Sequence, residues 1–209
     1  MNQDHSKKQL SHVAHATRRD LETEVLVVGG SIVGLTAALA CQRQGLAVLL
    51  AEKHEAPSVH PRASRYHARA VEVFRALGVE SDVRDAGADL EGAVGTISGP
   101  DLLRALAART ADPAALYRRM RTVEEELSPA PSARAPQNRV EPVLRSIAAA
   151  RGCDLRFSSE IVDLVPTHDG VTARMVHRGT GAAQTVRARY AVVADGAQGR
   201  TRERLGIER

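Results

Sequence analysis

Residues 25–35, with the sequence VLVVGGSIVGL, join a short apolar run to a glycine-rich turn. A dinucleotide-binding turn follows the pattern G-x-G-x-x-G, whereas Gly29-Gly30-Ser31-Ile32-Val33-Gly34 has serine at the middle position. Gly29 and Gly34 suit the outer positions, which need a sharp turn and close packing of helix on strand. Ser31 is small, and we expect its N–H and its hydroxyl to donate to a phosphate at a helix N-terminus. The turn alone does not separate a nucleotide site from an unrelated glycine cluster or a membrane span.

The uncharged run from Val25 to Cys41 tests the hypothesis of a membrane-spanning helix. This run has 17 residues, fewer than the ~20 that a spanning helix needs, and charged residues flank it closely at Glu24 and Arg43. Its glycines interrupt a helix in the first half of the run. We therefore expect a buried strand that leads into a helix, and no membrane span. The polar first 22 residues have no apolar segment of a secretory signal, and we expect a disordered tail.

The residues around the turn predict a βαβ unit. Residues 25–28 have the apolar pattern of a strand buried on both faces, and a helix follows the glycines and ends at Gly45. A second buried strand follows in LAVLLAEK, residues 46–53. Glu52 closes that strand, 18 residues after Gly34, where an acidic side chain accepts hydrogen bonds from ribose hydroxyls and disfavours a 2′-phosphate. Without the βαβ context, the alternative interpretation is that Glu52 is a surface acid at a strand end.

The rest of the chain predicts further helices and a β-rich excursion. We expect an amphipathic helix from Ser64 that stops at Gly78, and a second helix over 139–152 with Pro142 in its first turn. Short strands and turns are expected over 87–100, a helix over 102–108, a proline-rich loop over 128–137, and strand-like runs over 153–167, 171–178 and 185–196.

Composition limits the class of protein. The net charge of +4 and the pI of about 9.5 come from basic residues spread among acidic ones, which predicts a generally basic surface and no nucleic-acid stripe. Aromatic residues make up only 2% of the chain, so base stacking is disfavoured. Cys41 and Cys153 have no metal-ligand spacing, and we expect two buried, reduced thiols in a cytoplasmic protein without a metal site.

Ordered motifs beyond the turn resemble one family. They are VLVVGGSIVGLTAAL, AEK, HPRAS, EVFRALGV, QNRVEPVLRSIAAARG and RARYAVVADGAQGRTRERLGI. Their order and spacing resemble the FAD-dependent aromatic hydroxylases of the p-hydroxybenzoate-hydroxylase type, and especially the branch that hydroxylates polyketides. The resemblance implies an α/β, Rossmann-like FAD-binding domain with a small β-rich excursion. It also implies bound FAD, NAD(P)H as electron donor, and a small aromatic, polyketide- or phenol-like substrate.

The resemblance also implies site residues. The turn would hold the diphosphate, Glu52 the ribose, and Arg62 the pyrophosphate; Gln137 would lie beside the ribityl and phosphate region, and the Asp195-Gly196 turn would contact FAD. The cofactor carries the chemistry in such enzymes, so no catalytic side chain is assigned. The predicted cofactor-binding set is Gly29, Gly30, Ser31, Gly34, Glu52, Lys53, Arg62, Gln137, Asp195 and Gly196. One departure is Gly199, where the family pattern has serine; Arg202 is retained.

The domain predicted over 23–209 is incomplete relative to the family, because the family's substrate-covering sheet and second ribityl-binding motif lie beyond its DG turn. A fragment, a truncated gene product and a chain completed by a partner remain open. A FAD- or ADP-binding remnant without hydroxylase activity is the alternative function, and a basic interaction module is a weaker one. Substrate identity, the choice between NADH and NADPH, and the oligomeric state are left open by the sequence.

Overall fold

A computed structural model describes residues 20–90, 99–107, 122 and 125–208. In this part of the chain, a six-stranded sheet has the order β5-β2-β1-β8-β7-β6. Strands β5, β2, β1 and β8 are parallel, and β7 pairs antiparallel with both β8 and β6. The strands of the sheet are β1 Leu21–Val28, β2 Val48–Ala51, β5 Asp154–Arg156, β6 Ser159–Thr167, β7 Gly170–His177 and β8 Ala183–Val193. Two-residue strands β3 (Arg65–Tyr66) and β4 (Ala133–Arg134) pair separately.

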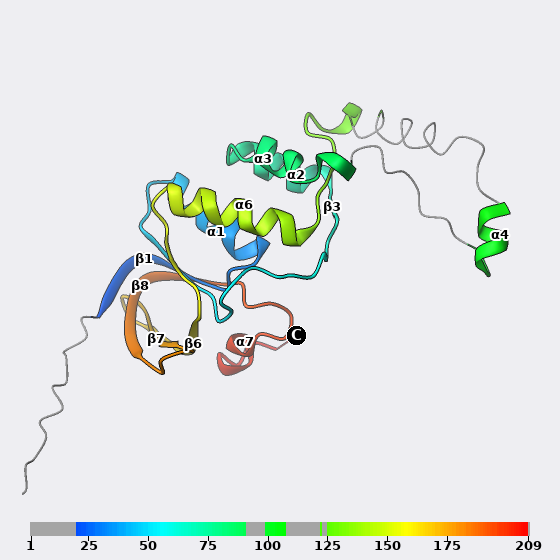
Figure 1. Cartoon of the computed structure of the whole chain (residues 1–209). Coiled ribbons are helices and arrows are strands. Elements are labelled where there is room, and N and C mark those ends of the chain that lie inside the picture. The colour runs from blue at the N-terminus through cyan, green and yellow to red at the C-terminus, as the bar shows by residue number, and fades with distance from the viewer. Residues whose placement is uncertain (1–19, 91–98, 108–121, 123–124, 209) are drawn as a thin grey trace, which may run out of the picture.

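The helices lie mainly on one side of β1, and β6 and β7 lie on the other (Figure 1). The described helices are α1 Ile32–Arg43, α2 Ala68–Ala76, α3 Glu80–Asp85, the 3₁₀ helix Ala88–Leu90, α4 Leu102–Ala107, α6 Gln137–Ala150 and α7 Arg200–Arg204. The predicted βαβ unit is confirmed as β1, α1 and β2, with Gly45 at φ 82° after the helix. The fold class predicted from the sequence, a Rossmann-like α/β domain, is confirmed.

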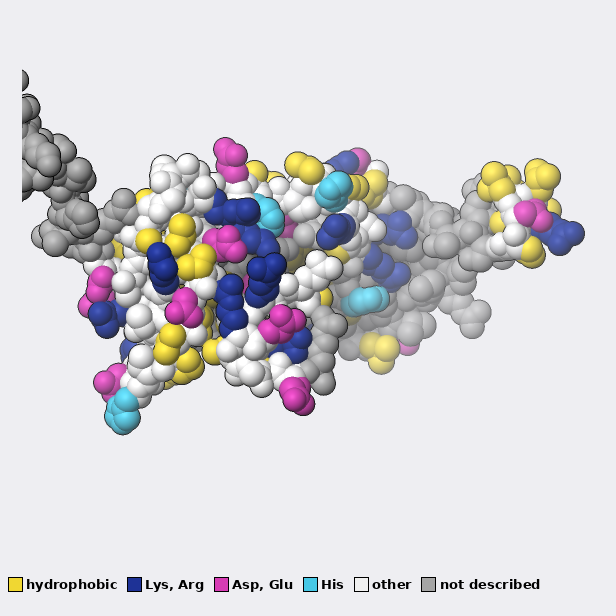
Figure 2. Space-filling model, turned by 90° about the horizontal axis from the view of Figure 1, so that it is seen from below, with side chains coloured by type: hydrophobic (Ala, Val, Ile, Leu, Met, Phe, Trp, Pro, Cys, Tyr) yellow, Lys and Arg dark blue, Asp and Glu magenta, His cyan; other side chains and the backbone are white. Residues whose placement is uncertain are grey.

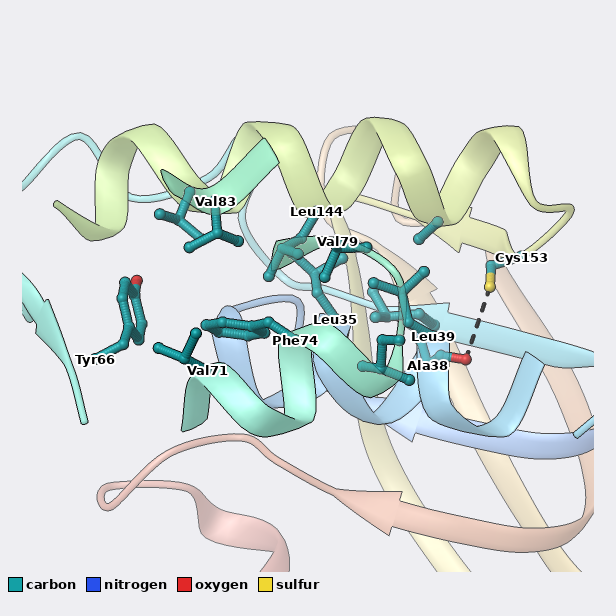
Figure 3. Close-up of a cluster of buried hydrophobic side chains, with 14 of the residues drawn as sticks. Leu35, Ala38, Leu39, Tyr66, Val71, Phe74, Val79, Val83, Leu144 and Cys153 are labelled. Carbon is teal, nitrogen blue, oxygen red and sulfur yellow. Dashed lines mark hydrogen bonds between the residues drawn. The ribbon is translucent and has the colours of Figure 1, made fainter. Parts of the chain in front are cut away.

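Alternate residues of β1 enter two different cores. Val25 and Val27 face a core shared with α1, α2, α3 and α6, while Leu26 and Val28 face a core shared with β6, β7 and β8. Figure 3 shows the first core, in which Tyr66 and Phe74 meet edge to face with ring centroids 5.2 Å apart. Burial of β1 on both faces explains its continuous apolar run.

Several local predictions need correction. The helix predicted from Ser64 begins at Ala68, because Arg65–Tyr66 pairs with Ala133–Arg134 inside the predicted loop 128–137. The next helix begins at Gln137, so Pro142 lies in its second turn. The strand-like run 153–167 is two strands, broken where Ser158 adopts φ 55°. Cys153 is buried as predicted, whereas Cys41 is half-buried, and both thiols are free.

Two predicted segments, the N-terminal tail and residues 87–100, lie partly outside the described part of the chain. Leu21 and Glu22, placed in the tail by the prediction, belong to β1, while residues 1–19 lie outside the described part. Residues 91–98 and 108 also lie outside it; the described residues 88–90 are a 3₁₀ helix.

Charges of both signs share the surface. On the face seen from below, Lys and Arg side chains are interspersed with Asp and Glu side chains (Figure 2). None of the helices in the described ranges combines the length and the apolar character needed to cross a bilayer.

Candidate functional site

The glycine turn is shaped by close backbone approach. Gly29 has φ 108°, in the region that favours glycine, and a Cβ there would overlap the carbonyl of Ala194 at the end of β8. A Cβ on Gly34 would overlap the Gly29 carbonyl oxygen, so glycine lets α1 pack against the turn. A Cβ on Gly30 would lie 2.7 Å from the Glu52 Cβ. Gly29 and Gly34 therefore meet the steric demands of the two outer positions of a dinucleotide turn.

Helix α1 begins directly after this turn, with Ser31 as its N-cap. No side-chain hydrogen bond caps the helix, and its first turn carries no acidic residue. The first N–H groups of a helix have no acceptor within the helix, and the helix dipole places positive potential there. The start of α1 can therefore receive an anion such as a diphosphate.

Glu52 follows β2 and reaches across to the turn. Its Oε2 accepts a hydrogen bond from the Gly30 N–H at 2.6 Å, and its Oε1 accepts one from the His54 N–H at 2.8 Å. The His54 imidazole Nδ1 lies 2.6 Å from the same Oε1. A carboxylate has about four acceptor positions, so Glu52 retains capacity for ribose hydroxyls.

Gln137 and Ser31 meet through a residue that the sequence reasoning did not single out, Glu141. The Gln137 amide Nε2 donates to the Ser31 Oγ at 3.1 Å and to the Glu141 Oε1 at 2.6 Å. The Ser31 hydroxyl donates to the same Oε1 at 2.5 Å. The Ser31 hydroxyl thus donates to Glu141 in this structure, and its contact with a phosphate stays a prediction.

Asp195 lies where β8 ends beside the glycine turn. A Cβ on Gly29 would lie 3.2 Å from the Asp195 backbone nitrogen, and Gly196 has φ 87°. The Asp195 Oδ2 accepts hydrogen bonds from the Thr201 hydroxyl at 2.7 Å and the Thr201 N–H at 3.2 Å. A Cβ on Gly199 would overlap the Asp195 carboxylate, so glycine at this departure from the family pattern leaves room for the contact.

Arg62 and Lys53 are exposed and border this set. The carbonyl of Arg62 accepts a hydrogen bond from the Gln137 N–H at 2.9 Å, which attaches the Arg62 loop to the start of α6. The structure thus brings the glycine turn together with Glu52, Gln137 and Asp195, and it places the Arg62 backbone beside Gln137. Among the described residues, the side chains of Arg62 and Lys53 make no hydrogen bond or ion pair with that group.

Three residues of the site were missed by the sequence reasoning: Glu141, Thr201 and Ser58, whose N–H donates to the Glu141 Oε2 at 2.8 Å. Glu141 had a signal, because it stands four positions after Gln137 on a helix, and such pairs share a face. The contacts of Ser58 and Thr201 depend on loop geometry, for which the sequence carries no pattern.

Burial, and then the negative charge of Glu141, raise the pKa of the Tyr66 phenol above its usual range.

Residues 22–209 match the family described as "FAD binding domain". The chain belongs to this FAD-binding domain family. Among curated relatives of this domain, aklavinone 12-hydroxylase DnrF of Streptomyces peucetius subsp. caesius is 42% identical over 90% of the chain and 38% of the relative. The 4-methyl-5-nitrocatechol 5-monooxygenase of a Burkholderia species is 37% identical over 92% of the chain and 34% of the relative.

Solved structures agree with this assignment. A ternary complex of aklavinone-11 hydroxylase with FAD and aklavinone has a TM-score of 0.73 and 31% identity, covering 90% of this chain and 35% of that one. The flavin-dependent monooxygenase PieE, in complex with FAD and substrate, has a TM-score of 0.68 and 32% identity, over 90% of this chain and 32% of that one. The resemblance to FAD-dependent aromatic hydroxylases is therefore confirmed. This FAD-binding domain spans less than two fifths of the length of these relatives.

Proposed function

We propose that residues 23–209 form the FAD-binding domain of a flavin-dependent monooxygenase that hydroxylates an aromatic substrate with NAD(P)H as electron donor. The observation that carries the proposal is the convergence of the glycine turn, Glu52, Gln137 and Asp195 at the carboxyl ends of β1, β2 and β8. Ligands of open α/β sheets bind at such edges, where the chain leaves neighbouring strands in opposite directions.

Each residue of the site then has a part that fits one segment of FAD. Glu52 accepts hydrogen bonds from the ribose hydroxyls, and the N-terminus of α1 receives the diphosphate. Arg62 supplies charge-assisted hydrogen bonds to the phosphate oxygens, with Lys53 beside it. Gln137, Asp195 and the open Gly196 turn would contact the ribityl chain. Bound FAD supplies the redox chemistry that reduces O₂ with electrons from NAD(P)H and transfers one oxygen atom to an aromatic ring.

The substrate class rests on the names of the relatives. They include hydroxylases of aklavinone, monooxygenases of tetracenomycins and a 2,4-dichlorophenol 6-monooxygenase. An electron-rich aromatic ring of the polyketide or phenol class is common to them. We propose such a substrate, a cytoplasmic location, and no nucleic-acid or membrane partner.

The alternative is a FAD- or ADP-binding domain that does not hydroxylate. The structure has a cavity of about 250 Å³ lined by residues of β5 to β8 and the segments joining them, and none of the proposed FAD-binding residues borders it. Most of the proposed FAD-binding residues are assigned to the adenosine and diphosphate half of FAD, and few to the half that carries the flavin ring. Oxygen transfer needs a water-free cavity around the flavin ring.

Oxygen uptake by the 209-residue chain tests the proposal. FAD, NADH or NADPH and a phenolic or polyketide-like substrate are supplied, and hydrogen peroxide and the product mass are measured. We expect FAD binding and NAD(P)H oxidation that ends as peroxide, because none of the residues described in the structure is proposed to enclose the flavin ring. A product with one added oxygen atom would show that residues 1–209 suffice for hydroxylation. Absence of FAD binding would contradict the proposed function.

A further inference from the structure

Glu141 is a buried carboxylate with three neutral donors. Its side chain is on α6, and the residue is only 1% exposed. Oε1 accepts from the Ser31 hydroxyl at 2.5 Å and from the Gln137 amide at 2.6 Å, and Oε2 accepts from the Ser58 N–H at 2.8 Å. Burying a charge without hydrogen bonds is strongly unfavourable, so these donors and this carboxylate depend on one another.

The three donors belong to three separate segments of the chain. Ser31 starts α1 in the glycine turn, Ser58 lies in the loop that carries Arg62, and Gln137 starts α6. The Gln137 N–H also donates to the Arg62 carbonyl at 2.9 Å, which fixes the same loop at a second point. Each segment carries a residue proposed to contact the diphosphate or ribityl part of FAD.

We infer that Glu141 is a positioning residue of the FAD site, holding these three segments in the arrangement that receives the diphosphate. The inference rests on the proposed FAD-binding function. Glu141 contacts no ligand in this role. It acts through Ser31, Gln137 and the Arg62 loop.

A glutamine at this position has the same shape but only one acceptor oxygen. If its amide nitrogen faces Ser58, two donors oppose each other and the Arg62 loop is released. If its amide nitrogen faces Ser31 and Gln137, their shared acceptor is lost, and both side chains must turn to accept instead. Either orientation disrupts the present arrangement of at least one segment of the site.

For Glu141→Gln, the loss of charge and the loss of positioning predict opposite changes in FAD affinity. Glu141→Gln removes a negative charge near the start of α1, so electrostatics alone would strengthen the binding of an anionic diphosphate. Loss of positioning would weaken it. The direction of the change therefore separates the inference from a simple charge effect.

The experiment compares wild-type protein with Glu141→Gln and with Glu72→Gln as a matched control. Glu72 also accepts a hydrogen bond from a serine hydroxyl, that of Ser128 at 2.8 Å, and one from Arg69 at 2.7 Å, but it lies on α2 and hydrogen-bonds to none of the proposed FAD-binding residues. FAD affinity is measured by calorimetry, adenosine affinity by ligand-observed NMR, and stability by urea unfolding without ligand.

We expect Glu141→Gln to weaken FAD binding about tenfold, the effect of one charged hydrogen bond. Adenosine, which lacks the diphosphate and is held by Glu52, should keep its affinity, and Glu72→Gln should keep both affinities. FAD affinity in Glu141→Gln that equals or exceeds wild type would overturn the inference. An equal loss for FAD and adenosine would also overturn it, since that result indicates general loosening.

A second variant covers the case in which Glu141→Gln does not fold. Glu141→Asp keeps the charge but is one methylene shorter and cannot reach all three donors, so it should weaken FAD binding several-fold and leave adenosine unchanged. Undiminished FAD affinity in this variant would overturn the inference. Wild-type protein that fails to bind FAD would instead overturn the proposed function, so the two failures are distinguishable.

Discussion

The parallel half of the sheet carries the proposed FAD-binding residues, whereas the antiparallel half contributes mainly to core packing. The proposed FAD-binding residues cluster where the parallel strands β1, β2 and β8 end, because the carboxyl ends of parallel strands share one edge and α1 begins there. Strands β6 and β7 run in alternating directions and offer no such edge; their apolar side chains form the core behind β1 and β2. Changes in the antiparallel half should therefore affect folding, and changes at the parallel edge should affect FAD.

The largest effect is expected in the antiparallel half. Ile161 on β6 is 7% exposed and belongs to the core behind β1. Ile161→Ala should lower the free energy of unfolding by about 2–5 kcal/mol, through lost burial and a cavity. Urea unfolding measures the loss, and FAD calorimetry on the folded fraction should give the wild-type affinity. A selective loss of FAD affinity would break the proposed division.

Glu52→Ala is the matching change at the parallel edge. Removing the carboxylate should weaken FAD binding by about 1.5–3 kcal/mol, the value of a charged hydrogen bond to the ribose. The unfolding free energy without ligand should fall by less, because the lost partners are the solvent-accessible His54 and one turn N–H. If stability falls as much as binding does, Glu52 is a structural residue instead.

Gly34→Ala tests the packing beneath the turn. The added Cβ would overlap the Gly29 carbonyl oxygen, so α1 must move away from β1. We expect a loss of about 1–3 kcal/mol in unfolding free energy, together with weaker FAD binding. Gly45→Ala is the control, since nothing lies within 4 Å of a Cβ there and only its positive φ is strained. Similar FAD affinity in both variants would contradict the role of Gly34 in the site.

The smallest effect is expected just after β8, the strand that both halves share, where Thr201 on α7 contacts Asp195. Thr201→Val keeps the side-chain shape but removes the hydroxyl that donates to Asp195 at 2.7 Å. The unfolding free energy should fall by about 0.5–1.5 kcal/mol, since the Thr201 N–H still donates to the same oxygen. A thermal-shift measurement with and without FAD checks this, and an unchanged melting temperature would mean that the hydroxyl contributes nothing.

Local patterns in the sequence predicted much of the parallel half. The βαβ unit followed from an apolar strand, three glycines and a helix stop at Gly45, whereas the contact of Glu52 with Gly30 was not predicted and the ribose contact of Glu52 stays a prediction. Strand β3 could not be predicted, because a two-residue strand has no periodicity, and its pairing with β4 joins distant segments.

The polar network of the site was the harder part to predict. Ser31 and Glu141 are 110 positions apart, so their hydrogen bond depends on how α6 packs over α1. Residue types at a single position carry no information about such a partner. The sequence therefore predicted which segments form the site but not the carboxylate that joins them, nor that the Ser31 hydroxyl would donate to it.

Calorimetric titration with FAD, NAD⁺ and ADP is the most direct test of the central claim, that the parallel edge is an FAD site. Gln137 and the Asp195-Gly196 turn are proposed to contact the ribityl chain, which adenosine diphosphate lacks, and a simple NAD domain does not need them. We predict that FAD binds most tightly, ADP more weakly and NAD⁺ no better than ADP. Tighter binding of NAD⁺ than of FAD would contradict the account.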